Sequence, residues 1–225
     1  MINLHTHTTF SDGLFPPESI VERAAKDGLT HIAITDHFET TKVASLRTSD
    51  FDKYLLAIKG LRKKYEGTIE VLAGVEIDAN PDRCDLENLP FDMLNKLDLV
   101  LFENVNDRAN DGGEIEDLDC VLSKVSVPRG LAHSDIKTSF RDMEAGEIAD
   151  LLSSRSLFVE LNTALPYRRD GMTFYERAED VFHEFRGKVK LSIGTDIHRR
   201  LTEVSNVQSA YSFVRRLNLN NNLLF

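Results

Sequence analysis

The chain has 225 residues, and its 41% hydrophobic and 28% charged residues suit a soluble globular protein that buries a full core. No apolar run is long enough to span a bilayer, and a formal net charge of −10 disfavours general affinity for nucleic acid or anionic membranes. The N-terminus lacks a secretion signal, and Cys84 and Cys120 are too far apart for a thiolate zinc site. We therefore expect one cytoplasmic domain, residues 1–225.

Short apolar runs typical of strands alternate with helical patterns along the whole chain. The predicted strands are residues 2–8, 31–37, 69–77, 97–103, 130–133, 157–162 and 190–195. The predicted helices are residues 17–27, 51–65, 118–125, 144–153, 173–185 and 204–217. This alternation predicts an α/β fold with a mostly parallel sheet, either a barrel or a doubly wound sheet.

Nearly every predicted strand ends in a residue that can bind a metal ion. These residues are His5, His7, Asp12, His37, Glu76, His133, Asp196 and His198. The carboxyl ends of parallel strands face a common mouth, and residues two apart on a strand share a face. The eight imidazoles and carboxylates are therefore expected to converge on one pocket. They are too many for one ion and suit two or three, with Glu76 as a bridging carboxylate.

Each motif is weak alone, because a single strand-end carboxylate is more often a helix cap and a single histidine is often a satisfied core residue. The joint pattern is specific, since five of the seven histidines lie at predicted strand ends. The other two, His31 and His183, are expected to be structural or surface residues. Asp36 and Asp135 are candidates either for orienting the ligand histidines or for capping.

These motifs, in this order, resemble the polymerase-and-histidinol-phosphatase (PHP) family. The matching segments are H-T-H at 5–7, S-D-G at 11–13, T-D-H at 35–37, G-V-E at 74–76, A-H-S-D at 132–135 and G-T-D-I-H at 194–198. The resemblance implies a distorted (β/α)7 TIM-like barrel with a trinuclear metal site at the C-terminal mouth of the strands, and phosphoesterase activity.

The resemblance also implies a distribution of ligands. One ion would take His5, His7, Glu76 and Asp196, a second Glu76 and His133, and a third Asp12, His37 and His198. The family's usual histidine at the end of the fourth strand is missing here. Glu103 or Asn104 could replace it, because oxygen ligands suit Mn or Mg, or the second metal position could be weak or empty.

The chemistry expected of such a centre is hydrolysis of a small phosphate ester. Two or three divalent ions (Zn, Mn or Fe) would activate water as hydroxide near neutral pH and neutralise the phosphoryl oxygens. The resemblance places phosphate-binding arginines near Arg168 and Arg199, and guanidinium groups can bind phosphate through two parallel hydrogen bonds.

Three alternatives remain open from the sequence. One is hydrolysis of a carbonyl substrate, as in amidohydrolases, which the arginines disfavour. Another is a nuclease or nucleotidase acting on short nucleic-acid ends, with a long duplex disfavoured by the acidic composition. The last is a non-catalytic, metal-stabilised binding module, which the missing histidine supports. The motifs leave the substrate, the metal and the oligomeric state undetermined.

Overall fold

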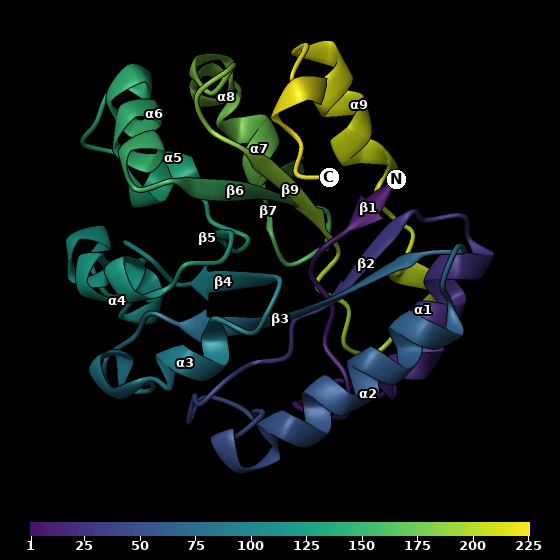
Figure 1. Cartoon of the computed structure of the whole chain (residues 1–225). Coiled ribbons are helices and arrows are strands. Elements are labelled where there is room, and N and C mark those ends of the chain that lie inside the picture. Colours follow the sequence, from purple (N-terminus) through teal and green to yellow (C-terminus); the bar gives the residue numbers. More distant parts are fainter.

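The computed structural model describes residues 1–225, and its centre is a seven-stranded parallel sheet with the strand order β1-β2-β3-β4-β5-β6-β9. The strands are β1 (Ile2–Asn3), β2 (His31–Ile34), β3 (Glu70–Asp78), β4 (Leu99–Glu103), β5 (Arg129–Leu131), β6 (Leu157–Asn162) and β9 (Leu191–Gly194). The sheet curls so that its two edges meet: Leu4 N donates to Ile193 O at 2.7 Å, and Thr6 bridges Ile197. This nearly closed barrel confirms the expected TIM-like fold (Figure 1).

Helices surround the barrel (Figure 1). They are α1 (Pro17–Lys26), α2 (Phe51–Lys64), α3 (Phe91–Leu94), α4 (Asp119–Lys124), α5 (Ile136–Ser139), α6 (Ala145–Ser154), α7 (Phe174–Arg177), α8 (Glu179–Glu184) and α9 (Gln208–Arg216). Short 3₁₀ helices cover Thr48–Asp50, Leu86–Asn88, Arg108–Asn110, Ile115–Leu118, Leu201–Glu203 and Asn220–Asn222. Because helices cover the outside and side chains fill the inside, strands such as β4 and β6 are buried along their whole length.

Three predicted elements differ from the structure. The first predicted strand is a regular strand only at Ile2–Asn3, and single backbone hydrogen bonds and the Thr6 bridge continue its pairing beyond that point. The predicted helix over residues 173–185 is interrupted at Ala178, whose backbone leaves the helical region, and the helix predicted from Val204 begins at Gln208 after a 3₁₀ turn.

A small antiparallel hairpin was not predicted. It joins β7 (Arg168–Arg169) to β8 (Met172–Thr173) through Asp170 and Gly171, which both have positive φ. An Asp-Gly pair suits such a tight turn, because Gly adopts positive φ without a steric penalty. The hairpin follows β6 and therefore lies at the C-terminal mouth of the barrel. No helix of the structure has the length and apolar character needed to cross a membrane.

Candidate metal centre

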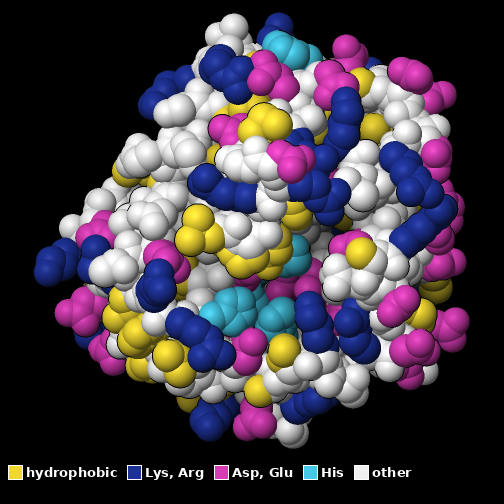
Figure 2. Space-filling model, turned by 180° about the vertical axis from the view of Figure 1, so that it is seen from behind, with side chains coloured by type: hydrophobic (Ala, Val, Ile, Leu, Met, Phe, Trp, Pro, Cys, Tyr) yellow, Lys and Arg dark blue, Asp and Glu magenta, His cyan; other side chains and the backbone are white.

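The eight predicted ligands come together at the C-terminal mouth of the barrel. Figure 2 views the molecule from behind and shows histidine side chains in a hollow of this face, with basic and acidic side chains around it. Four overlapping groups of His, Asp and Glu each have donor atoms within 4.8 Å of one another. Together they contain His5, His7, Asp12, His37, Glu76, His133, Asp196, His198 and, in addition, Glu103.

The deepest group surrounds the end of β1. His7 Nε2 lies 2.9 Å from Asp196 Oδ1 and 3.4 Å from Glu76 Oε2, and His5 Nε2 lies 3.0 Å from His7 Nε2. His5 Nε2 is also 3.3 Å from Glu76 Oε1 and 3.4 Å from Asp196 Oδ1. Ligands about 2.0–2.1 Å from a tetrahedral zinc are roughly 3.3 Å apart. The spacing of His5, His7 and Asp196 therefore fits one divalent ion, and Glu76 lies at its edge.

Glu76 extends from this group toward two neighbours. Its Oε1 lies 2.9 Å from His133 Nε2, and its Oε2 lies 3.0 Å from His37 Nδ1. A fully buried carboxylate that faces imidazoles on both sides has the position of a bridging ligand. The histidine charges outweigh burial and hold the pKa of Glu76 well below its usual range, so the side chain is ionised.

The third expected group is looser and lies nearer to solvent. His198 Nε2 is 3.2 Å from Asp12 Oδ1, whereas His37 Nε2 is 3.9 Å from the same oxygen. Burial alone would lower the pKa of His198, but the hydrogen bond to Asp12 and the charge of Asp196 raise it to about 9. Without a metal, His198 and Asp12 therefore form an ion pair.

The structure distinguishes between the two residues that could replace the missing fourth-strand histidine. Glu103 is 1% exposed and lies with His37 and Glu76 in one of the four groups. Asn104 instead donates from its side chain to Asp78 Oδ1 at 2.8 Å, outside these groups. Burial and the neighbouring Glu76 charge raise the pKa of Glu103, which indicates that excess negative charge accumulates here without a metal.

Sequence reasoning missed Glu160, a buried acid in the middle of β6. Its Oε1 lies 2.9 Å from His5 Nδ1, and its Oε2 accepts from the His133 backbone N–H at 2.6 Å. With a metal ion bound, this contact would keep the ring proton of His5 on Nδ1 and direct the Nε2 lone pair into the cluster. A Cβ at Gly194 would lie 1.8 Å from Glu160 Oε1, so the glycine of the G-T-D-I-H motif makes room for this contact. An acidic residue inside an otherwise apolar strand was the available signal.

Asp36 and Asp135 orient no ligand histidine through a hydrogen bond, so that expectation is wrong. Asp36 accepts from Thr8 and Ser11 and holds the loop that carries Asp12. Asp135 accepts from Arg177 at 2.7 Å and from the Thr138 hydroxyl. Its backbone occupies the N-cap position of α5, but its side chain makes no cap hydrogen bond.

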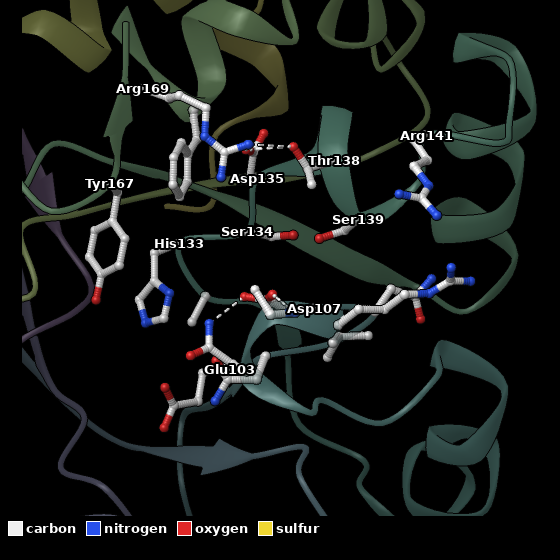
Figure 3. A pocket seen from close by; sticks show the side chains of 18 of the residues that line it. Glu103, Asp107, His133, Ser134, Asp135, Thr138, Ser139, Arg141, Tyr167 and Arg169 are labelled. Carbon is white, nitrogen blue, oxygen red and sulfur yellow. Dashed lines mark hydrogen bonds and ion pairs between the residues drawn. The ribbon is translucent and has the colours of Figure 1, made fainter. Parts of the chain in front are cut away.

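Tyr167 is a second residue that the motifs did not indicate. Its ring stacks on His133, with centroids 4.1 Å apart and planes 4° apart, and its hydroxyl donates to Asp196 Oδ2. Figure 3 shows the two rings side by side at the wall of a cavity. Because Oδ2 is bound by Tyr167, Asp196 presents its Oδ1 to the two N-terminal histidines.

The orphaned buried atoms of the cluster test whether it fits metal ions. Ten buried side-chain nitrogen and oxygen atoms have no hydrogen-bond partner, and five of them belong to this cluster. They are His7 Nδ1, His37 Nδ1, Glu76 Oε2, Glu103 Oε1 and Asp196 Oδ1. Buried polar atoms are normally paired, so several unpaired atoms within one cluster fit bound cations. His133 and Asp196 also adopt positive φ, and such backbone strain is common at functional sites.

Two cavities flank the cluster, with Pro166 and Tyr167 lining both. The arginine cavity, of about 850 Å³, is lined by Asp12, Arg168, Asp196, His198, Arg199 and Arg200 among others. The Glu103 cavity, of about 560 Å³, is lined by Lys42, Glu103, His133, Asp135, Arg141 and Arg169 among others (Figure 3). Arg168 and Arg199 therefore lie beside the cluster, and neither forms an ion pair.

Known proteins resemble this chain over most of its length. Residues 3–109 match the family model of the PHP domain. The DNA polymerase/3'-5' exonuclease PolX of Bacillus subtilis is 29% identical over 200 residues, which are 87% of this chain and 34% of PolX. A probable histidinol-phosphatase of Thermotoga maritima is 27% identical over 210 residues, covering 88% of this chain and 84% of that protein. The chain thus spans about a third of one relative and most of the other.

A solved structure supports the fold. The histidinol phosphate phosphatase of Lactococcus lactis, determined with zinc, L-histidinol and phosphate, superposes with a TM-score of 0.68. The alignment covers 99% of this chain and 95% of that chain at 18% identity. At this identity the likeness establishes the shared barrel, and the chemistry has to be argued from the cluster itself.

Proposed function

We propose that the chain, whose residues 3–109 match the PHP domain, belongs to that family and is a metal-dependent phosphoesterase that hydrolyses a small phosphate ester. The observation that carries the proposal is the convergence of nine His, Asp and Glu side chains, with unpaired buried atoms, beside two arginines without ion-pair partners. We also propose that residues 1–225 act as one catalytic domain.

The eight strand-end residues would hold two or three divalent ions, with Zn, Mn and Fe as the candidates. Such ions lower the pKa of water and neutralise phosphoryl oxygens when bound. Around them, Glu160 fixes the tautomer of His5, and Tyr167 fixes the carboxylate of Asp196. The protein's part is therefore to hold donor lone pairs in place before substrate arrives.

Arg168 and Arg199 would bind the non-bridging oxygens of the phosphate. Both line the arginine cavity next to His198 and Asp12, and neither is neutralised by a carboxylate. Two guanidinium groups would hold the tetrahedral group and add positive charge where it becomes more negative during attack.

The organic part of the substrate would then lie in the Glu103 cavity. Its volume of about 560 Å³ lies within the range of roughly 300–1,000 Å³ that is usual for small-molecule sites. Its lining is rich in polar side chains, including Ser134, Thr138 and Ser139 (Figure 3). This lining suits a polar alcohol, such as a sugar, a nucleoside or an amino alcohol, better than an apolar one.

A second candidate is cleavage of nucleotides from short nucleic-acid ends. The similarity to the exonuclease PolX favours it. The formal charge of −10 argues against a long duplex, because duplex binding depends on neutralising many phosphates. The two unpaired arginines of the arginine cavity, Arg168 and Arg199, suit one or a few nucleotides.

A substrate panel tests these assignments. Protein reconstituted with Mn²⁺ or Zn²⁺ would be assayed against an aryl phosphate monoester, a bis-aryl phosphate diester, a short single-stranded oligonucleotide and a cyclic amide. We expect the monoester to be turned over fastest. Preference for the oligonucleotide would establish the second candidate, whereas turnover of the amide alone, or of no substrate, would contradict the proposal.

A further inference from the structure

The two carboxylate oxygens of Glu103, the last residue of β4, have different partners. One faces the cluster of predicted metal ligands, and the other binds a lysine. Glu103 Oε1 faces His37 Nδ1 at 3.5 Å, and Oε2 accepts from Lys42 Nζ at 2.7 Å. Lys42 comes from the loop after β2, and its side chain is one-third exposed, whereas that of Glu103 is 2% exposed. The lysine reaches the carboxylate from the Glu103 cavity, so the two oxygens have separate roles.

Three unpaired atoms from neighbouring strand ends meet at this point. They are His37 Nδ1, Glu76 Oε2 and Glu103 Oε1, all buried and all without a hydrogen-bond partner. His37 Nδ1 is only 3.0 Å from Glu76 Oε2, yet the geometry of a hydrogen bond is not met. Such an arrangement is costly for unpaired polar atoms, and it is the arrangement of ligands that share one cation.

The two ring nitrogens of His37 point in different directions and could bind different ions. Its Nε2 is 3.9 Å from Asp12, whereas its Nδ1 is within 3.5 Å of both Glu76 and Glu103. A neutral imidazole has one nitrogen lone pair, so it can bind one ion at a time. His37 belongs to both groups of donor atoms, and its shorter distances lie on the Glu103 side.

Lys42 balances the negative charge of Glu103, a charge that a neutral imidazole at this position would not carry. A glutamate adds a negative charge beside the buried Glu76, and an isolated buried carboxylate is expensive. The Lys42 ammonium balances that charge and fixes the second oxygen, so that Glu103 offers a single oxygen to the cluster. A Glu103–Lys42 pair therefore has the net charge of a neutral histidine but supplies an oxygen donor.

We propose that His37, Glu76 and Glu103 form a binding site for a divalent ion that prefers oxygen ligands, such as Mn²⁺, and that Lys42 is a positioning residue for Glu103. Two carboxylate oxygens and one imidazole favour Mn²⁺ or Mg²⁺ over Zn²⁺ relative to a histidine-rich site. The inference rests on the proposed multinuclear centre, but it concerns the composition of one position in it.

The test counts ions rather than turnover. Chelator-treated full-length protein would be titrated with Mn²⁺, with bound ions counted by equilibrium dialysis and electron paramagnetic resonance. Glu103→Gln is expected to bind one Mn²⁺ fewer than the wild type. Glu103→His is expected to regain the ion as Zn²⁺ while binding Mn²⁺ at that position about 10-fold or more weakly, as expected for a site with fewer oxygen donors.

Lys42→Met separates the proposed role from that of an ordinary ion pair. It is expected to keep the ion count but to lower the Tm of the metal-free protein by at least about 3 °C, because a buried carboxylate loses its partner. Added Mn²⁺ should raise the Tm of this variant by more than that of the wild type. The control is Lys188→Met, which removes an equally short but exposed pair with Asp150 and should change neither quantity.

The opposite results are equally clear. If Glu103→Gln binds as many Mn²⁺ ions as the wild type and loses as much metal-free Tm as Lys42→Met, Glu103 is only the partner of a structural ion pair and the site is refuted. If Glu103→Gln binds one ion fewer than the wild type, but the wild type hydrolyses no phosphate ester, the proposed function is refuted and this site stands. If the wild type hydrolyses a phosphate ester and Glu103→Gln binds as many ions as the wild type, the site is refuted and the proposed function stands.

Discussion

The two cavities beside the metal cluster differ in the state of their basic residues. In the Glu103 cavity, Lys42 binds Glu103, Arg169 lies 3.3 Å from Asp135, and Arg141 lies 3.6 Å from Asp142. In the arginine cavity, Arg168 and Arg199 form no ion pair. Three of the four Lys and Arg side chains of the Glu103 cavity are therefore paired, with Arg108 as the exception. Two of the three in the arginine cavity are unpaired, since only Arg200 forms an ion pair, with Glu203.

The sequence alone does not distinguish arginines that bind an anion from arginines that only line a cavity. Unpaired guanidinium groups attract an anion, whereas paired ones contribute shape, hydrogen bonds and a fixed lining. An arginine counted from the sequence therefore says little until its partners are known. Arg168 and Arg169 are neighbours in the hairpin, yet they line different cavities, and only Arg169 forms an ion pair.

The largest effect is expected at Asp196, which contacts His7 beside the arginine cavity and is held by Tyr167 at the boundary between the cavities. Asp196→Asn removes the charge of a carboxylate whose Oδ1 lies 2.9 Å from His7 Nε2. Because even partners of ligands cost about 10–100-fold when mutated, kcat for an aryl phosphate should fall by more than about 100-fold. Steady-state kinetics with saturating metal checks this, with the surface variant Asp150→Asn as control. Retention of a tenth of wild-type activity would exclude Asp196 from the centre.

A smaller effect is expected from the arginines, and it tests the difference between the cavities directly. Arg199→Ala should raise KM for a phosphomonoester by about 10-fold or more, since one charge-assisted hydrogen bond contributes roughly 1.5–3 kcal/mol. Arg169→Ala should change KM less, because Arg169 is already paired with Asp135. Arg216→Ala, at an exposed residue that is paired with Glu179 and lines neither cavity, is the control. Equal effects of Arg199→Ala and Arg169→Ala would remove the distinction between the cavities.

Tyr167→Phe should have a more modest consequence. The stacked ring on His133 is kept, but the hydrogen bond that fixes Asp196 Oδ2 is lost. We expect kcat to fall by about 10-fold with KM little changed, and metal affinity to weaken in parallel, as for other groups that orient ligands. The matched control is Tyr175→Phe, whose hydroxyl bonds only Ser209. A changed KM with unaltered metal affinity would assign Tyr167 to substrate binding instead.

The smallest effect concerns the pH dependence of stability in the metal-free protein. The pKa of His198 is raised to about 9 by Asp12 and Asp196 against the opposing effect of burial. A raised folded-state pKa stabilises the fold fully below the unfolded value of 6.5, and this stabilisation is lost as pH rises through 9. The Tm of chelated protein should therefore fall between pH 6.5 and 9, and His198→Asn should make that fall shallower. An unchanged slope in His198→Asn would show that the ion pair with Asp12 is absent in solution.

The convergence of the strand-end residues could be predicted from the sequence, because their positions follow from the alternation of strands and helices. Glu160 and Tyr167 could not be placed in the same way, since their roles depend on which strand lies next to β1 when the barrel closes. The partner of Glu103 was equally hidden, because Lys42 lies in a loop 61 residues away along the chain. The interruption at Ala178 also escaped prediction, as the apolar pattern continues through it while the backbone does not.

The most direct test of the central claim is to follow phosphate release and metal content together in one preparation. Chelator-treated protein would be titrated with Mn²⁺ or Zn²⁺, and hydrolysis of an aryl phosphate would be measured at each ratio of bound ion to chain. The cluster geometry predicts no hydrolysis without metal and activity that rises until at least two ions are bound per chain. Full activity in the chelated protein, or saturation with bound metal and no hydrolysis, would contradict a metal-dependent phosphoesterase.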